Sequence, residues 1–309
     1  MPLSQAFRAY PLCRPLLLPL AWILVLAASP ASPDSGSAGG GSAPASETAA
    51  AAASAARVPE PEAEGRTEGG GAAGAAGAAG SGLAAVPWKI GEYFQFSIDW
   101  NGLNGGNSLM QVQNLTRVDG RRAYRIVMKA ESNSFVSKFY KVRDRAESFI
   151  DAESLYTRRF VKRLREGGYE KDIDVRFDQE ARKARYSDGE TFDVAPGVHD
   201  VLSAFYYVRT VPLPTGASLT IPTHDNKKSY EMLVKVHRRE KVEVPAGKFD
   251  CVVVEPILKS EGVFKSKGSI LVWLTDDERR IPVLVKSKIP IGSISVSLTD
   301  MRLEFTGRK

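Results

Sequence analysis

The stretch Phe94-Gln95-Phe96-Ser97-Ile98-Asp99-Trp100 places a large apolar side chain at every second position. Successive side chains of a β-strand point to opposite faces, so this spacing predicts a strand with one apolar and one polar face. The same period of two recurs in residues 124–130 and 293–298. Repeated alternation is typical of antiparallel sheets that bury one face. The sequence therefore predicts an all-β domain.

Residues that favour turns separate the alternating segments. They are Asp119-Gly120, Gly167-Gly168, Asp188-Gly189, Ala246-Gly247 and Asp276-Asp277. Glycine and aspartate tolerate the backbone conformations of tight turns. The segment from Asn101 to Asn107, which contains three glycines, is expected to turn the chain after the first strand. This spacing predicts an antiparallel meander of about a dozen strands, curled into a barrel-like sheet.

The charges around Gly167-Gly168 test the hairpin interpretation. With a two-residue turn at these glycines, Arg165 lies opposite Glu170. Two positions further from the turn, Arg163 lies opposite Asp172. The basic strand that holds both arginines therefore meets acidic side chains on its neighbour. Because these charges are matched locally, we expect no nucleic-acid partner.

One segment departs from the β pattern. Side chains at helical spacing are Val198, Val201, Leu202, Phe205, Tyr206 and Arg209. We expect a single short helix from about Val198 to Arg209, with Asp200 in the first turn, where a carboxylate complements the helix dipole. Such a helix either plugs one end of the barrel-like sheet or forms the wall of a ligand cavity.

The first 31 residues have the features of a secretory signal peptide. Arg8 and Arg14 precede an apolar run from Leu16 to Ala28, and Ser29-Pro30-Ala31 supplies small residues after it. The apolar run is short for a helix that crosses a bilayer. We therefore expect cleavage after Ala31 and an exported protein, periplasmic or otherwise associated with the envelope. We expect no transmembrane segment in the mature chain.

Composition divides the rest of the chain into a tether and a domain. Residues 32–82 consist mainly of Ala, Gly, Ser and Pro, which offer too little apolar surface to fold, so we expect a disordered tether. Residues 83–309 are expected to form one β-barrel-like domain. This domain holds 38 of the 42 basic and 30 of the 36 acidic side chains, so it is mildly basic. Its one cysteine, Cys251, lies in an apolar run and is expected to be buried.

The histidines His199, His224 and His237 are the first candidates for chemistry, and two of them precede an aspartate. No pair has the spacing of a helical zinc motif, so we predict no metal. The sequence contains neither a Gly-x-Ser-x-Gly elbow nor a phosphate-binding glycine loop, and we predict no cofactor. A hydrolase would need groups such as His199, Asp200 and Glu255 in one cleft.

Several segments together resemble a bacterial exported family catalogued as domain of unknown function 3108. They are Gly91-Glu92-Tyr93, Trp100-Asn101-Gly102, the residues from His199 to Tyr207, Pro245-Ala246-Gly247-Lys248-Phe249, Trp273 to Pro282, and Ile289-Pro290-Ile291-Gly292. The resemblance covers Val86 to Phe305 and none of the tether. It implies a β-rich single domain in the cell envelope. It brings no reaction, cofactor or catalytic residue with it.

These observations favour a noncatalytic β-domain of the periplasm or envelope over an enzyme. A curled sheet with one helix can enclose a lipid-like or other apolar ligand. Candidate contact residues are Phe94, Phe96, Trp100, Phe205, Tyr206 and Trp273. Large aromatic side chains also fill protein cores, so the same six residues fit a closed interior. An envelope scaffold that binds a protein partner is a second hypothesis, and a hydrolase of cell-envelope material is the alternative.

Overall fold

The computed structural model describes residues 83–259, 270–289 and 292–303. The predicted signal peptide (1–31) and the predicted tether (32–82) lie outside the described residues. So do Pro290 and Ile291 of the last segment that resembles the family. Among the described residues, no helix is both long enough and apolar enough to span a membrane.

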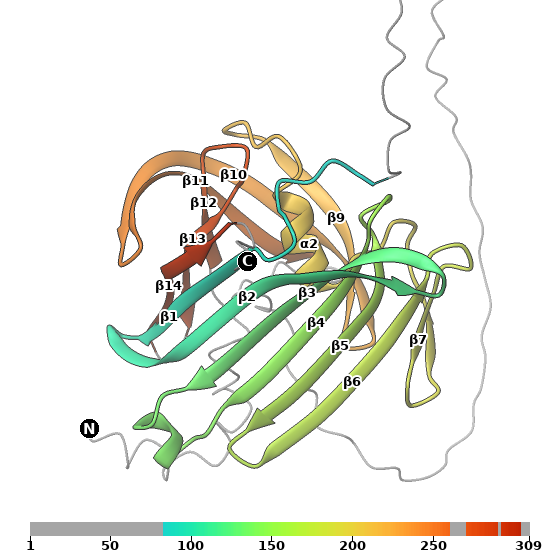
Figure 1. The fold of residues 1–309 in the computed structure, drawn as a ribbon, viewed down its shortest axis with the longest axis horizontal. Coiled ribbons are helices and arrows are strands. Elements are labelled where there is room, and N and C mark those ends of the chain that lie inside the picture. Colours follow the sequence, from blue (N-terminus) through green and yellow to red (C-terminus); the bar gives the residue numbers. More distant parts are fainter. Residues whose placement is uncertain (1–82, 260–269, 290–291, 304–309) are drawn as a thin grey trace, which may run out of the picture. The chain divides into compact units, whose positions relative to one another are not determined.

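Fourteen strands of the described part form one antiparallel sheet (Figure 1). They are β1 (Tyr93–Trp100), β2 (Leu103–Val118), β3 (Arg121–Ser132), β4 (Arg143–Asp151), β5 (Thr157–Glu166), β6 (Tyr169–Asp178), β7 (Lys183–Tyr186), β8 (Thr191–Asp193), β9 (Ser218–Asp225), β10 (Lys228–Val244), β11 (Gly247–Lys259), β12 (Ile270–Thr275), β13 (Pro282–Ile289) and β14 (Gly292–Arg302). A short 3-10 helix, η3 (Val136–Lys138), precedes β4, and the α-helix α2 (Val201–Val208) lies between β8 and β9.

The predicted antiparallel all-β architecture is confirmed, but the strand number of about a dozen is too low. β7 and β8 are four and three residues long. Strands of this length are too short to show a period of two in the sequence. They can be recognised only by the neighbours with which they pair.

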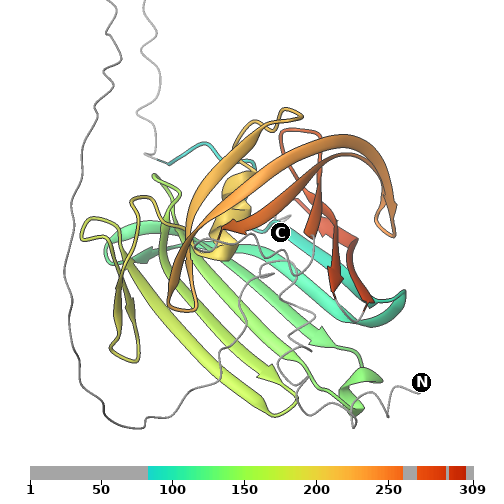
Figure 2. The same ribbon diagram turned by 180° about the vertical axis from the view of Figure 1, so that it is seen from behind.

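The order of the strands explains how the sheet curls. It runs β8-β7-β6-β5-β4-β3-β2-β1-β14-β13-β12-β11-β10-β9. The first and last strands of the chain pair in its middle, and the two edges are β8 and β9, which flank α2 in sequence. Figures 1 and 2 show the sheet bending around α2. No backbone ladder joins β8 to β9 in the described residues, so the sheet curls without closing into a complete barrel.

β1 buries the face that its alternation predicts. Phe94, Phe96 and Ile98 are all buried. Ile98 lies directly opposite Val296 of β14, so the apolar faces of the two strands are continuous. Burying one large apolar side chain contributes roughly 1.5–3 kcal/mol, and this shared face is therefore a main source of core stability.

The turn after β1 is shorter than expected. It consists of Asn101 and Gly102, both with positive φ, and β2 begins at Leu103. Gly106 lies inside β2 instead of in the turn. A Cβ at this position would come 2.2 Å from the Glu131 carbonyl oxygen of β3. Glycine here permits a close approach of two strands, which a sequence pattern cannot distinguish from a turn.

The hairpin at Gly167 confirms the predicted register. Arg165 lies opposite Glu170 and Arg163 lies opposite Asp172, as a two-residue turn requires. The Arg165 guanidinium also contacts the Asp172 carboxylate at 2.6 Å. The Arg165 charge is therefore paired within the hairpin itself.

The helix α2 is shorter than the predicted segment, 198–209. Asp200 has extended backbone angles, and its carboxylate accepts hydrogen bonds from the backbone N–H groups of Leu202 and Ser203. This N-cap begins the helix at Val201. His199 stays extended and forms a parallel bridge with Thr223 of β9. The His199 backbone before the helix thus attaches α2 to the edge strand β9.

A buried ion pair attaches the other end of α2. The Arg209 guanidinium donates to both carboxylate oxygens of Glu92, at 2.7 and 2.9 Å, and both side chains are almost completely buried. The rings of Trp88, Phe94 and Tyr206 surround the guanidinium within 5.6 Å. Burial alone would lower the pKa of Arg209, but the Glu92 carboxylate raises it above its ordinary value. Arg209 is therefore a fixed cation in an apolar environment.

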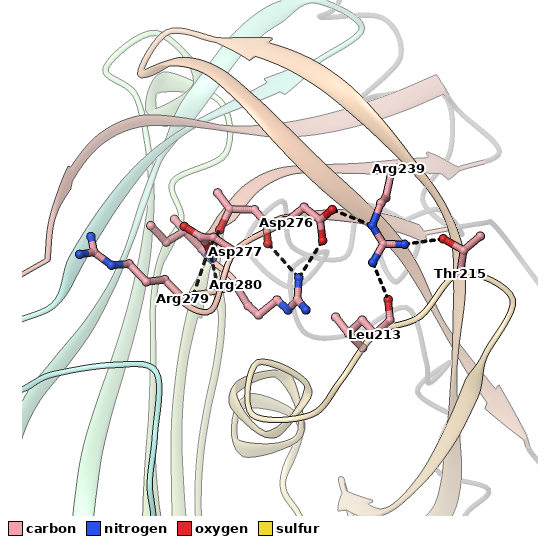
Figure 3. A network of polar contacts seen from close by, with 9 residues as sticks. Leu213, Thr215, Arg239, Asp276, Asp277, Arg279 and Arg280 are labelled. Carbon is pink, nitrogen blue, oxygen red and sulfur yellow. Dashed lines mark hydrogen bonds and ion pairs between the residues drawn. The ribbon is translucent and has the colours of Figure 1, made fainter.

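Further polar contacts connect this end of α2 to the β12–β13 turn. Arg209 donates to the Arg279 carbonyl oxygen. Figure 3 shows the adjacent network, in which Arg239 of β10 contacts Asp276 at 2.6 Å and donates to the Leu213 carbonyl oxygen. Arg280 pairs with Asp276 at 3.1 Å within the same turn. The segment after α2, β10 and the β12–β13 turn are thereby held together.

Replacing Glu92 with Gln tests the ion pair. The change preserves the size of the side chain but leaves the Arg209 charge buried without its counterion, so the free energy of unfolding should fall by about 3–5 kcal/mol. Urea denaturation followed by tryptophan fluorescence measures this. Arg165→Ala, which breaks an exposed pair, is the control and should barely move the midpoint. Equal midpoints for the two variants would show that the buried pair has no structural role.

Candidate functional site

The buried polar residues near the start of α2 form the candidate site. We define the inner polar cluster as Ser148, Thr157, Lys162, Asp200, Asp225 and Tyr230. These side chains come from β4, β5, α2's N-cap, β9 and β10, so strands far apart in sequence build it. The cluster lies where the two edge regions of the sheet approach each other, because Lys162 and Asp225 belong to opposite sides of the unclosed sheet.

Asp200 is the most heavily hydrogen-bonded member of the inner polar cluster. Besides its two helix N–H contacts, its carboxylate accepts from the Ser148 hydroxyl at 2.6 Å and the Thr157 hydroxyl at 2.8 Å. Burial raises the pKa of Asp200, while these four donors act to lower it. With all its acceptors in use, the side chain fixes α2 on β4 and β5.

The two His-Asp dipeptides are brought side by side by the backbone. The His199 N–H donates to the Pro222 carbonyl at 2.9 Å, and the His224 N–H donates to the His199 carbonyl at 2.9 Å. Their side chains serve different sets of partners. His199 Nδ1 contacts the Ser203 hydroxyl at 3.1 Å. The dipeptides therefore converge without directing their imidazoles at a common point.

His224 connects the β9–β10 hairpin to the opposite edge region. Its Nε2 contacts the Tyr186 hydroxyl of β7 at 2.9 Å, and its Nδ1 contacts Ser229 at 2.8 Å. The Lys227 backbone N–H donates to the same Tyr186 hydroxyl. Side chains thus bridge strands that no backbone ladder joins. Burial lowers the pKa of both His199 and His224 to about 4, so both are neutral at pH 7.

Lys162 and Asp225 place a buried ion pair in the inner polar cluster. The Lys162 ammonium contacts Asp225 at 3.1 Å and the Asn226 side-chain oxygen at 3.2 Å. Burial lowers the pKa of Lys162, and the attraction of Asp225 opposes that shift. The pair holds β5 against the tip of the β9–β10 hairpin.

Tyr230 differs from the other members of the inner polar cluster. Its hydroxyl oxygen is buried and has no hydrogen-bond partner among the described residues. Burial, together with the nearby Asp225 and Asp200 carboxylates, raises its pKa well above the ordinary value, so it keeps its proton. A buried hydroxyl without a partner is rare, because leaving it unpaired costs free energy. It is the one member of the cluster that can donate to a further molecule.

The residues proposed for hydrolysis do not share a site. Glu255 lies on β11 and hydrogen-bonds to His237 at 2.7 Å. It occupies the face opposite the buried Val254, whereas His199 and Asp200 are buried at the start of α2. Among the described residues, no group of three or more His, Cys, Asp or Glu side chains is arranged to hold a metal ion.

The six predicted ligand contacts fall into different environments. Phe94, Phe96 and Tyr206 are buried in the core, and Trp100 and Phe205 are half-buried against it. The Trp100 indole N–H has no hydrogen-bond partner in the described part of the protein. These five side chains remain predicted ligand contacts.

Trp273 is separated from the other five. Ile98, Val296, Val285 and Val272 lie opposite one another across four strands, so they share one face, and Trp273 follows Val272 on the opposite face. There its indole N–H donates to Glu240 of β10 at 2.6 Å. The period of two within β12 could have indicated this face, but only the register relates it to β1.

Several residues of the site carry no signal in the sequence. Lys162 lies in a strongly basic strand and Tyr230 follows a polar turn, so both read as surface residues. The Glu92 and Arg209 pair joins positions 117 residues apart. Cys251 was predicted to be buried, and it is.

The two buried histidines, His199 and His224, predict a specific pH dependence of stability. Their folded-state pKa of about 4 lies below the ordinary 6.5, so the unfolded chain binds protons first as the pH falls. Each histidine contributes up to about 3 kcal/mol to the free energy of unfolding. This contribution is fully present above pH 6.5 and is lost as the pH falls towards 4. Replacing His199 with Asn removes one titrating group, so the free energy of unfolding should fall less steeply over this range. Parallel curves for the variant and the native chain, measured by urea denaturation, would contradict the assignment.

The fold is similar to that of one solved structure at a TM-score of 0.50, and weaker matches follow. A β-barrel-like protein of domain of unknown function DUF1849 from Brucella abortus matches with a TM-score of 0.50 and 12% identity, over 70% of this chain and 99% of that one. A candidate exported protein with a YmcC-like fold from Bacteroides fragilis gives a TM-score of 0.34 and 13% identity, over 71% and 99% of the two chains. A DUF1089 family protein from Pseudomonas aeruginosa gives a TM-score of 0.33 and 13% identity, over 57% of this chain and 87% of that one.

No curated protein matches the chain. The model of one family, described as a protein of unknown function (DUF3108), matches residues 95–299. This range begins in β1 and ends in β14, so it includes α2 and the whole inner polar cluster. The match includes every quoted segment except Gly91-Glu92-Tyr93, so the family resemblance is confirmed, and the chain belongs to the DUF3108 family.

Proposed function

We propose that this chain is an exported, noncatalytic β-domain that binds a lipid-like or other apolar ligand with a polar end. The export part of the proposal rests on the basic start, short apolar run and small residues of 1–31. The ligand part rests on the curled sheet, whose inner face carries both a large apolar surface and the inner polar cluster.

The unpartnered Tyr230 hydroxyl carries the ligand proposal. It is a protonated donor on the same face of the β9–β10 hairpin as Thr223, which lies directly opposite it. The core residues Met232 and Val234 follow on that face of β10. A ligand with an apolar body and an acceptor at one end would satisfy the hydroxyl while contacting this apolar surface. The Trp88 and Trp100 indole N–H groups and the Tyr206 hydroxyl are further buried donors without a partner among the described residues.

The use of the buried titratable groups favours binding over hydrolysis. Asp200 caps α2, Arg209 pairs with Glu92, and Lys162 pairs with Asp225. A general acid or base must reach a proton of the substrate. These side chains are instead engaged with one another. Two imidazoles contact a serine hydroxyl: that of His224 is also held by the Tyr186 hydroxyl, and that of His199 is buried against Tyr156 and Tyr207. We therefore place hydrolysis of envelope material second.

A Tyr230→Phe exchange tests the ligand proposal, because it removes one oxygen atom and keeps the ring. The affinity for a fluorescent fatty-acid probe, measured by titration, should fall roughly twofold to tenfold, as expected for one lost hydrogen bond. Tyr169→Phe is the matched control, since that ring is exposed at the start of β6, and it should leave the affinity unchanged.

Native mass spectrometry of the protein purified from its host envelope provides an independent readout. A bound apolar molecule should accompany the native chain. If nothing co-purifies and the native chain does not bind the probe, the ligand proposal is wrong. If the probe binds equally well to the Tyr230 variant, the polar end of the ligand lies elsewhere.

A further inference from the structure

The loop between β3 and β4 exposes two phenylalanine rings beside a cluster of basic residues. Phe135 and Phe139 are 58% and 60% exposed, which is unusual for such large apolar side chains. Their rings contact each other edge to face, with centroids 5.8 Å apart. The two rings therefore form one continuous apolar projection around the short helix η3.

The loop that carries these rings is well ordered by polar contacts. The Asn133 side chain accepts from the Val136 N–H at 2.9 Å and donates to the Asn104 carbonyl of β2 at 2.7 Å. The Ser132 hydroxyl accepts from the Val142 N–H, closing the loop at its base. Internal contacts thus fix the backbone while the two phenylalanine rings remain in solvent. The two rings are therefore exposed by a loop whose backbone is held in place by its own polar side chains.

The β5–β6 turn supports the loop from the side. The Gly167 N–H donates to the Lys141 carbonyl at 2.8 Å. A Cβ on Gly167 would come 2.6 Å from the Tyr140 ring, so the glycine lets this ring pack closely. Tyr169, the first residue of β6, is 52% exposed and adds a third aromatic ring at this end of the sheet.

The charges around the rings are all of one sign along the loop. Residues 132–143 contain Lys138, Lys141 and Arg143, all exposed, and no acidic residue. One exposed carboxylate, Glu131, directly precedes the loop and lies opposite Arg143, and the carboxyl groups of Asp144 and Glu166 are buried behind the loop. Burial and the adjacent Asp144 raise the pKa of Glu166 to about 8, so this carboxyl is neutral at pH 7. The surface charge next to the phenylalanine rings is therefore positive.

We propose that this aromatic–basic loop, residues 132–143, docks the domain on an anionic lipid surface. The two rings would enter the interfacial region of the bilayer, and Lys138, Lys141 and Arg143 would contact anionic head groups. Exposed apolar rings beside an excess of basic over acidic side chains complement such a surface in both polarity and charge. The docking loop lies outside the inner polar cluster, so the proposal is independent of the ligand proposed above.

Vesicle flotation tests the docking loop. The protein is recovered from the envelope of an expressing bacterium, so that it is processed as the host delivers it. It is mixed with vesicles of phosphatidylcholine alone or with a third of phosphatidylglycerol. The native chain should float with the anionic vesicles and much less with the neutral ones. The double variant Phe135→Ser/Phe139→Ser should bind anionic vesicles at least tenfold more weakly, and Ile90→Ser, an exposed apolar residue before β1, should bind as the native chain does.

A variant without the basic side chains separates the electrostatic contribution to binding from the apolar contribution of the two rings. Each basic residue near an anionic surface is worth about fivefold in binding. Lys138→Gln/Lys141→Gln/Arg143→Gln should therefore lose most of the preference for anionic vesicles. The control Lys183→Gln/Lys241→Gln/Lys248→Gln lowers the net charge equally at other exposed positions and should keep the preference.

Three outcomes would overturn the docking proposal. The native chain could fail to bind either kind of vesicle, or the phenylalanine variant could bind like the native chain. In the third outcome, the two charge variants lose binding equally, which would show a nonspecific effect of net charge. Tyr230→Phe should leave flotation unchanged, so failure of the ligand proposal and failure of the docking proposal are distinguishable.

Discussion

The attachment of α2 at both ends is the constraint on which the rest of the fold depends. The first end is held by the Asp200 carboxylate, which accepts from the helix N–H groups and from Ser148 and Thr157 of β4 and β5. The second is held by the Arg209–Glu92 pair, which connects the helix to the start of β1. Because β1 lies in the middle of the sheet and β5 lies towards one edge, a single helix spans the curvature of the sheet.

This constraint explains how an unclosed sheet keeps a buried interior. The edges β8 and β9 share no ladder in the described residues, but Lys162–Asp225 connects β5 to β9 and Tyr186–His224 connects β7 to β9. A buried polar group without a partner costs free energy, whereas a paired one stabilises only the arrangement in which its partner is in reach. They favour one alignment of the two edge regions over others. The same physics makes the unpaired Tyr230 hydroxyl informative, because it stands among groups that are otherwise satisfied.

Local patterns in the sequence predicted the local structure well. The alternation in β1 and the hairpin register at Gly167 depend on neighbours a few residues apart, and both are confirmed. The helix was overextended because apolar spacing continues past its N-cap, where an attached extended segment has the same composition. Gly106 was assigned to a turn because a close strand approach also requires glycine.

The candidate site was harder to predict because long-range pairing creates it. Asp200 was recognised as a helix-start residue, but its hydroxyl donors come from β4 and β5, which no sequence spacing relates to it. Lys162 has the same local context as its exposed neighbour Arg163, and only the face of β5 separates them. The exposed Phe135 and Phe139 read as ordinary apolar residues in the sequence. Their significance comes from exposure, which is a property of the folded chain.

Native-state hydrogen exchange tests the central claim most directly. If α2 fastens the sheet, the amides of Leu202 and Ser203 should exchange only through global unfolding, with the same opening free energy as core amides such as that of Phe96. Breaking the Arg209–Glu92 pair should then lower all of these values together. The account would be contradicted if the α2 amides exchanged through a local opening of lower free energy while the β1 amides stayed protected.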